Sequence, residues 1–376
     1  MNILLVVPSY KPAYSYGGPV VVIALLAETL ARMGHAVSVY TTTANGRTGA
    51  GCARGPAGAG GRRAGHVLPP PHRRPHPRLA RFVAAPVGHR PRFDAVHLHS
   101  WWNLAMLGAA WVCRRRGITP VLSPHGMLSD YILTANNSGK KRFMHRVLGR
   151  QLLRTTRLHV STEQEMQESQ RLLPGWPGRV IPNPVTLPAQ EFARPTNPVF
   201  TIGFLSRIDP KKGLDVLIRA LAKVSFPYRL LVAGDGEAGY VQSLKDLAHT
   251  VGNADRLEWV GWQQGEAKFS FLAGLDLFAL TSHSENFAIV VIEALATGTP
   301  VFVSDQVGLH AFVTAHDYGW VTPLDEGVIT KNLTLAAADH AKAARIAATA
   351  PAAIRTAYED THLAQQYVDF YQSLPR

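Results

Sequence analysis

One unit recurs along both halves of the chain: a short apolar strand, a glycine-containing turn and an amphipathic helix. Strands are predicted at residues 3–7, 37–41, 95–99, 120–123, 200–205, 229–233, 257–260, 275–280 and 300–303. Helices are predicted at residues 20–33, 103–115 and 213–224 and from about residue 240. Apolar strands that alternate with helices form parallel sheets covered on both faces. The sequence therefore predicts an α/β protein.

Proline density separates the two halves. Residues 183–199 hold four prolines, which suits a linker, and a new strand-turn-helix unit starts directly after them. We expect an N-terminal domain over 1–182, a linker over 183–199, a second domain over 200–355 and a C-terminal helix over 356–376. Doubly wound sheets bind ligands at the carboxyl ends of their strands, so we expect a cleft between the two domains.

Several protein classes are excluded by simple counts. The longest apolar runs are about ten residues, too short to span a bilayer. The start of the chain lacks the basic segment of a signal peptide. Two cysteines, Cys52 and Cys113, form neither a disulfide framework nor a four-ligand zinc site. We therefore expect a cytoplasmic protein.

The net charge of +13 is concentrated in two segments. Residues 44–92 hold ten Arg, nine Gly and eight Pro with no acidic residue, and helices and central strands do not tolerate that composition. We interpret this segment as a basic loop, an unusual insert or sequence read in a shifted frame. It lacks the aromatic residues and motifs of a nucleic-acid binder, so we expect no nucleic-acid partner.

The second basic segment, residues 140–157, predicts an amphipathic helix. Four arginines recur every fourth residue with apolar residues between them: Arg142, Arg146, Arg150 and Arg154. Such a stripe is either a solvated helix face or a surface that binds anionic lipid headgroups. The second interpretation makes the protein peripheral at the inner face of a membrane.

Two cations follow the first strand of the second half. Arg207 and Lys212 would emerge at the carboxyl edge of the sheet, beside the N-terminus of the next helix. A helix N-terminus attracts anions through its dipole and its free amides. Two cations together with backbone amides are what a diphosphate requires.

Two carboxylates, Glu285 and Glu293, follow a later strand. If the helix starts near Glu285, eight helical residues separate them by about 12 Å. That distance is close to the span from the ribose to the sugar of a nucleotide diphosphate sugar. The amides of Asn286, Phe287 and Ala288 would then be free to bind phosphate.

Taken together, these motifs resemble those of the family 4 retaining glycosyltransferases, or glycosyltransferase group 1. The motifs are Gly17-Gly18, Gly34-His35-Ala36-Val37, Pro124-His125-Gly126, Asn183, Ser206-Arg207 through Lys212-Gly213, Gly234-Asp235-Gly236-Glu237, and Glu285 with Glu293. The resemblance covers nearly the whole chain outside residues 44–92. It implies the GT-B fold, in which two Rossmann-like domains face each other across a cleft and the C-terminal helix, here residues 356–376, crosses back to the N-terminal domain.

The resemblance also implies roles for individual residues. Arg207 and Lys212 would hold the donor diphosphate, Glu293 the ribose, and Glu285 the hydroxyls of the transferred sugar. His125 would lie under that sugar, Gly17 and Gly18 would let the backbone of the first domain approach the phosphates, and Gly234 would belong to the donor-binding site. The family has glycine where this chain has Asn286 and Ala288, a change that bears on the sugar preference.

The expected reaction moves a sugar from a UDP-, GDP- or ADP-sugar to a polysaccharide, lipopolysaccharide or lipid-linked acceptor. No Asp-x-Asp pair is present, so we expect neither a metal nor any other cofactor. A sugar-nucleotide epimerase of similar architecture and a catalytically impaired homologue remain as alternatives. His97 and His99 alternate on one predicted strand and share a face, at the edge of the cleft rather than in a metal site, because no third ligand is evident.

Overall fold

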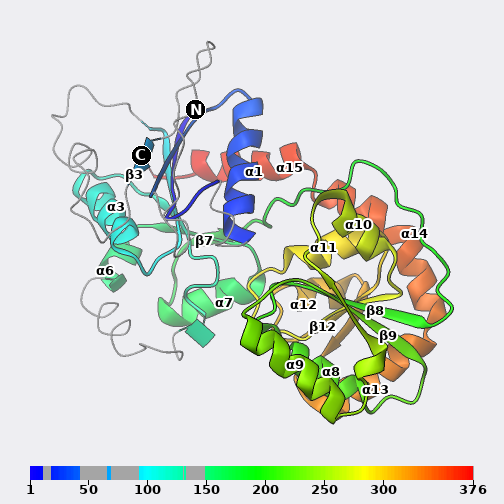
Figure 1. Cartoon of the computed structure of the whole chain (residues 1–376). Helices are drawn as coiled ribbons and strands as arrows, with labels where there is room; N and C mark the ends of the chain where they lie inside the picture. The colour runs from blue at the N-terminus through cyan, green and yellow to red at the C-terminus, as the bar shows by residue number, and fades with distance from the viewer. Residues whose placement is uncertain (12–17, 43–65, 69–92, 130, 133–148, 376) are drawn as a thin grey trace. The chain divides into compact units, whose positions relative to one another are not determined.

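The computed structural model describes residues 1–11, 18–42, 66–68, 93–129, 131–132 and 149–375. Gly17, Arg142, Arg146 and most of the predicted insert 44–92 lie outside these ranges. The chain forms two compact units (Figure 1). The N-terminal unit comprises Met1–Pro184 and Glu359–Arg376, and the C-terminal unit comprises Val185–Tyr358.

The N-terminal unit is built on a seven-stranded parallel sheet with the order β3-β2-β1-β4-β5-β6-β7. Its elements are β1 (Asn2–Val6), α1 (Gly18–Arg32), β2 (Ala36–Thr42), β3 (His66–Leu68), β4 (Ala95–His99), α3 (Leu104–Arg115), β5 (Val121–Ser123), α6 (Arg150–Leu153), β6 (Arg157–Val160), α7 (Glu163–Leu172), β7 (Gly178–Val180) and α15 (Asp360–Gln372). The one described part of the segment 44–92 is β3, which lies at an edge of the sheet. An edge is where a strand from a proline- and glycine-rich segment is tolerated.

The C-terminal unit contains a six-stranded parallel sheet with the order β10-β9-β8-β11-β12-β13. Its elements are β8 (Phe200–Leu205), the 3-10 helix η4 (Pro210–Lys212), α8 (Leu214–Leu221), β9 (Tyr228–Ala233), α9 (Ala238–Thr250), η5 (Ala254–Arg256), β10 (Leu257–Gly261), α10 (Gly265–Ala273), β11 (Leu277–Leu280), α11 (Ile289–Ala296), β12 (Val301–Ser304), α12 (His310–Ala315), β13 (Gly319–Thr322), α13 (Glu326–Ala338) and α14 (His340–Ala357). Helices lie on both sides of this sheet (Figure 1). The order of strands runs outward in both directions from β8 and β11, as in a doubly wound fold.

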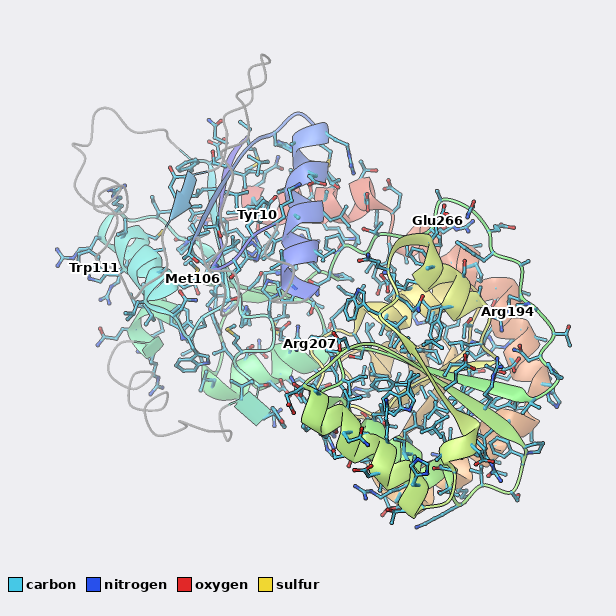
Figure 2. All side chains as sticks on the ribbon, in the orientation of Figure 1. Tyr10, Met106, Trp111, Arg194, Arg207 and Glu266 are labelled. Atoms are coloured by element: carbon cyan, nitrogen blue, oxygen red, sulfur yellow. The ribbon has the colours of Figure 1, made fainter. Side chains whose placement is uncertain are left out.

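The predicted linker 183–199 is mostly part of the C-terminal unit. Arg194, labelled in Figure 2, donates to Thr299 Oγ1 at 2.7 Å and to the Leu275 carbonyl at 3.0 Å. Asn197 donates to the Gly274 carbonyl at 3.0 Å. Most of the range predicted as a linker therefore belongs to the C-terminal unit, to which its polar side chains are hydrogen-bonded.

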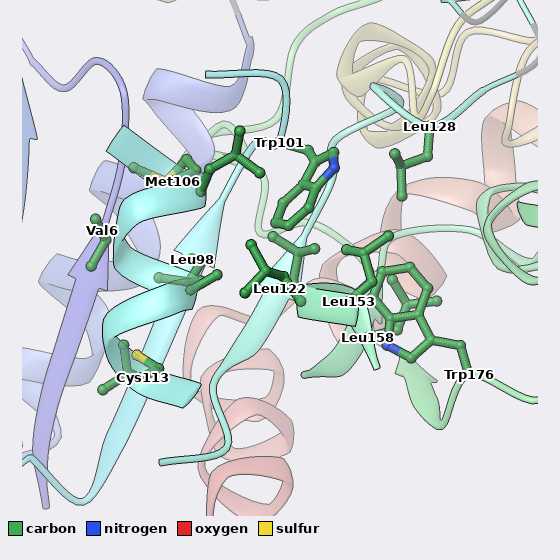
Figure 3. Packing of buried hydrophobic residues seen from close by; sticks show 14 of the residues in the cluster. Val6, Leu98, Trp101, Met106, Cys113, Leu122, Leu128, Leu153, Leu158 and Trp176 are labelled. Atoms are coloured by element: carbon green, nitrogen blue, oxygen red, sulfur yellow. The ribbon is translucent and has the colours of Figure 1, made fainter. Parts of the chain in front are cut away.

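The helix α15 completes the core of the N-terminal unit. Tyr367, Val368 and Tyr371 are buried together with Ile3 and Leu5 of β1. A second apolar cluster covers the other side of the sheet; Figure 3 shows it, with Trp101 and Trp176 among its largest buried side chains. The chain thus leaves the N-terminal unit at Pro184 and returns to it at Glu359.

Candidate active site

The loop between β8 and α8 is fixed by its own sequence. Asp209 Oδ1 accepts a hydrogen bond from the Lys211 amide at 3.0 Å, and Pro210 begins η4. Gly213 ends the turn with a φ of 65°, where a Cβ would come within 2.0 Å of the Thr281 carbonyl oxygen. Glycine is therefore required here both by its backbone conformation and by the close approach of β11.

Lys212 and Glu285 form an ion pair. Their side chains are 14% and 21% exposed, so water screens the pair only in part. The backbone of Glu285 is fixed as well: its amide donates to the Gln306 carbonyl at 3.0 Å, and its carbonyl accepts from the Gly308 amide at 2.7 Å. Two residues predicted from separate motifs thus meet in the C-terminal unit.

Arg207 and Gly234 lie at the same edge of the sheet, after β8 and β9. Arg207, labelled in Figure 2, is exposed and makes no hydrogen bond or ion pair with any residue that the structure describes. Gly234 has a φ of 146°, and a Cβ there would come within 1.9 Å of the Ser206 carbonyl oxygen. Gly234 therefore lets the ends of β8 and β9 approach each other, whether or not it also binds a ligand.

The predicted start of the helix after β11 is wrong. The helix α11 begins at Ile289, and Ala288 before it has a φ of 65° in the left-handed region. Glu293 is therefore the fifth residue of the helix rather than two turns inside it. The left-handed residue breaks the straight path of about 12 Å that eight helical residues would give.

The amides at the start of α11 are available to a ligand. Within the described ranges, the amides of Phe287, Ala288, Ile289 and Val290 donate no hydrogen bond, whereas the Val291 amide donates to the Ala288 carbonyl at 2.9 Å. Unpaired amides at a helix N-terminus bind anions. The amides without a hydrogen bond thus extend into the first turn of α11, farther along the chain than the sequence predicted.

Glu293 has a partner that the sequence analysis missed. Lys268 of α10 forms an ion pair with the Glu293 carboxylate, whose side chain is only 7% exposed. Burial raises the pKa of Glu293, and the nearby Lys268 ammonium opposes that rise. The two residues are joined only by the packing of α10 on α11. No spacing rule within one helix or strand would have found this pair.

In the N-terminal unit, His125 lies in the loop after β5, and its φ of 52° is also in the left-handed region. Its Nε2 is 3.0 Å from Nδ1 of His99, and the two rings are nearly parallel, with an interplanar angle of 13°. Burial lowers the pKa of His125 to about 4. Gly18 is the exposed first residue of α1, and Gly17 lies outside the described residues.

His97 and His99 share one face, and their ring centroids are 4.0 Å apart, but both side chains are buried rather than exposed at an edge. No group of three metal-ligating side chains occurs among the described residues. Burial, together with the neighbouring histidines, lowers the pKa of both rings well below the ordinary value. The two imidazoles are therefore neutral at pH 7.

A chain of hydrogen bonds crosses the core from α15 to the end of β7. It joins Tyr371 to His97 at 2.7 Å, His97 to Ser123 at 2.6 Å, Ser123 to His159 at 2.5 Å, and His159 to the Ile181 carbonyl at 3.0 Å. A carbonyl only accepts, so the neutral His159 must carry its proton on Nε2 and accept from Ser123 at Nδ1. Ser123 then accepts from Nε2 of His97, and Nδ1 of His97 accepts from the Tyr371 hydroxyl. Every proton in the chain points from Tyr371 towards Ile181.

Comparison with known proteins identifies the family. A model described as "Glycosyltransferase Family 4" matches residues 16–187, and one described as "Glycosyl transferases group 1" matches residues 189–351. The D-inositol 3-phosphate glycosyltransferase of Mycolicibacterium smegmatis is 30% identical over 292 residues, 69% of this chain and 66% of that protein. Its counterpart in Gordonia bronchialis is 29% identical over 248 residues, 59% of this chain and 53% of that protein. The match thus spans about half to two thirds of the length of these relatives.

Solved structures show the fold. Sucrose-phosphate synthase from Thermosynechococcus elongatus has a TM-score of 0.74 at 18% identity, covering 99% of this chain and 98% of that one. HepE from Anabaena, in complex with UDP and glucose, has a TM-score of 0.73 at 20% identity and covers both chains completely. Since two family models together match almost all of residues 16–351, and the fold is the GT-B fold, the chain belongs to the family 4 glycosyltransferases.

Proposed function

We propose that this chain transfers a sugar from a nucleotide diphosphate sugar to an acceptor hydroxyl, with retention of the anomeric configuration. The observation that carries the proposal is the Lys212–Glu285 ion pair together with the free amides at the start of α11. Cations and helix amides bind phosphate, whereas a carboxylate binds sugar hydroxyls. This combination suits a ligand with an anionic end and a sugar end. HepE, with the same fold, was solved with UDP and glucose.

The reaction is the one that the resemblance to the family implies. The bond between the sugar C1 and the phosphate oxygen breaks, and a bond from C1 to the acceptor oxygen forms on the same face of the sugar. The acceptor proton passes to the departing phosphate. Lys212, Arg207 and the α11 amides would stabilise the charge that develops on the diphosphate. Glu285 would hold the sugar hydroxyls and Glu293 the ribose.

A panel of UDP-, GDP- and ADP-sugars tests the proposal by nucleotide release and product analysis. We expect release with at least one donor, no effect of a chelator, and loss of release in Glu285→Ala. The matched control is Glu326→Ala, because Glu326 forms an ion pair with Lys223 at the surface of the same unit. Interconversion of the sugar without nucleotide release would instead indicate an epimerase, and no turnover of any donor would indicate an impaired homologue.

We also propose that the acceptor is a glycan presented at an anionic membrane surface, as on a lipid-linked precursor. None of the described helices is both long and apolar enough to cross a membrane. The support is a basic and aromatic surface on two helices that contact each other, α3 and α6. Trp111 of α3 is 43% exposed, with the Arg115 guanidinium 4.8 Å from its ring centre. Arg150 of α6 and Arg154, the residue that follows this helix, are exposed, whereas Arg142 and Arg146 are outside the described residues.

Sedimentation with vesicles tests this surface. We expect binding to vesicles that contain an anionic phospholipid, weaker binding to zwitterionic vesicles, and loss of binding in the double variant Arg150→Glu with Arg154→Glu. The double variant Arg229→Glu with Lys331→Glu changes the charge by the same amount on the C-terminal unit and should bind as the wild type does. Equal binding of all three proteins would contradict the proposal.

A further inference from the structure

The conformation of His125 requires an explanation. A residue other than glycine in the left-handed region is unfavourable by about 1 kcal/mol, and such strain persists only where surrounding contacts impose it. His125 has a φ of 52° and Gly126 after it has a φ of 74°. Two neighbours, Glu165 and His99, make the contacts that impose this conformation.

Glu165 of α7 holds the backbone of the loop. Its side chain lies in the core, with only 3% of the residue exposed. One carboxylate oxygen accepts the Gly126 amide at 2.6 Å, and the other accepts the Ser161 amide at 3.0 Å. A buried carboxylate that accepts backbone amides forms strong, charge-assisted hydrogen bonds. Glu165 therefore ties the residue after His125 to the end of β6.

His99 determines which ring nitrogen of His125 carries the proton. The contact between His99 Nδ1 and His125 Nε2 is 3.0 Å and uses one proton, while Nε2 of His99 is buried without a partner among the described residues. If His125 donated, His99 would carry a buried N–H with no acceptor, and such groups are rare in native proteins. The donor is therefore His99. Its Nε2 is then a buried acceptor without a hydrogen bond, which costs less free energy than a buried N–H without an acceptor.

The proton of His125 then lies on Nδ1. The structure records no hydrogen bond from this nitrogen to any described residue, and His125 is only half-buried. Burial keeps the ring neutral, because it lowers the pKa of His125 to about 4. A neutral ring with a free N–H donates to an uncharged oxygen without introducing a positive charge.

We infer that Glu165 and His99 are positioning residues that hold His125 as an Nδ1–H hydrogen-bond donor for an oxygen of a bound sugar. The identification of the ligand as a sugar rests on the proposed function. The tautomer of His125 and the positioning roles of Glu165 and His99 do not rest on it. His125 would be the residue that touches the ligand, whereas Glu165 and His99 would act through it.

Long-range proton–nitrogen NMR spectra of protein labelled with 15N-histidine test the tautomer without any substrate. We expect His125, assigned by comparison with His125→Gln, to be the Nδ1–H tautomer in the wild type at pH 7.5. In His99→Phe, which keeps a ring of similar size, we expect His125 to populate both tautomers. An Nε2–H tautomer in the wild type, or a His125 signal that does not respond to His99→Phe, would overturn the inference. The wild-type spectrum decides the question even if His99→Phe does not fold.

Steady-state kinetics test the positioning role of Glu165. We expect Glu165→Gln to lower kcat for sugar transfer about 10- to 100-fold, because small misplacements of a reacting group have effects of that size. The donor KM should change less than threefold. Glu163→Gln, on the exposed face of the same helix, is the matched control and should leave both constants unchanged. A rise in KM at constant kcat would contradict a positioning role. If the NMR results hold but no nucleotide sugar is turned over, the proposed function fails and the tautomer assignment stands.

Discussion

The two units place polar side chains at the carboxyl ends of parallel strands, but they use different chemistry there. In the C-terminal unit the side chains are charged and paired, Lys212 with Glu285 and Lys268 with Glu293. In the N-terminal unit they are neutral imidazoles, hydrogen-bonded to hydroxyls, to the backbone or to one another. Burial keeps those imidazoles uncharged.

The difference indicates which part of a ligand each unit suits. An ammonium in an ion pair can exchange its carboxylate for a phosphate, so the C-terminal unit suits an anion. A neutral donor suits a hydroxyl or an ether oxygen. Both units also have strained backbone after the carboxyl ends of their strands. Ser100 follows β4, His125 follows β5 and Ala288 follows β11, and each of these non-glycine residues has a positive φ. Strain of this kind concentrates at functional sites.

The largest effect should come from acid, and it should fall on the N-terminal unit. Burial lowers the pKa of His125 to about 4 and of His159 to about 3, from 6.5. Between pH 6.5 and 4 the unfolded chain therefore binds more protons than the folded one, and the free energy of unfolding falls as pH falls. Each of these rings should account for about 1.4 kcal/mol per pH unit, or about 2 kcal/mol at pH 5.

Urea unfolding followed by tryptophan fluorescence measures this loss. Replacing Trp259, Trp262 and Trp320 with Phe leaves tryptophan only in the N-terminal unit. We expect its unfolding midpoint to fall steeply from pH 7.5 to pH 5, and His159→Gln to reduce the pH slope by about one proton. A midpoint independent of pH would mean that the buried histidines of the N-terminal unit do not make its stability depend on pH.

The next largest effect is catalytic and belongs to the C-terminal unit. Lys212→Ala removes a cation from the proposed diphosphate site, and we expect kcat to fall about 100- to 1,000-fold. The exposed Lys223, which pairs with Glu326, gives the control Lys223→Ala, which should retain full activity. Circular dichroism should show the same fold for both variants. Retained activity in Lys212→Ala would mean that the charged edge does not bind the donor.

Lys268→Met should destabilise the C-terminal unit by about 3 kcal/mol at pH 8, because it leaves the buried Glu293 carboxylate without its cation. The pKa of Glu293 is already raised by burial and would rise further, so the carboxylate takes up a proton as pH falls. The destabilisation should therefore be smaller at pH 5.5. The double variant Lys268→Met with Glu293→Gln should recover most of the stability in the same urea titration, and no recovery would rule out a charge effect.

The smallest effect concerns the strained residue before α11. Ala288→Gly should stabilise the C-terminal unit by up to about 1 kcal/mol, because glycine adopts a φ of 65° without a Cβ penalty. Ala294→Gly, inside the same helix, should destabilise it by about 1 kcal/mol. Thermal unfolding of the two variants should shift in opposite directions. Shifts in the same direction would mean that the strain at Ala288 is not significant.

Local sequence patterns predicted the strands well. The strands at 95–99 and 200–205 have the predicted bounds, because each is an apolar run closed by polar or turn residues. The predicted start of α11 is too early because Glu285 to Ile292 reads as continuous helix; the one sign of the left-handed residue is that the family has glycine at the position of Ala288. The attachment of the predicted linker to the C-terminal unit could not be predicted, because its hydrogen bonds, such as that of Arg194 to Thr299, join residues about a hundred positions apart.

In the candidate site, too, residues that belong to a sequence motif could be predicted, and residues that act through packing could not. Lys212 and Glu285 were found because each belongs to a recognisable motif, and the fold brings them together. Lys268 and Glu165 belong to no motif; their roles come from packing against a different helix or loop. The directions of the hydrogen bonds from Tyr371 to Ile181 could not be predicted from the sequence either, because they depend on the contact of His159 with the Ile181 carbonyl.

The return of α15 to the N-terminal unit has a consequence for synthesis on the ribosome. Residues 360–372 supply part of the core around β1, yet they are translated after the whole of the C-terminal unit. The C-terminal unit can therefore fold first, while the N-terminal unit, although made earlier, must wait with Ile3 and Leu5 uncovered. During that interval the older half of the nascent chain exposes part of its apolar core, and exposed apolar surface of this kind favours aggregation.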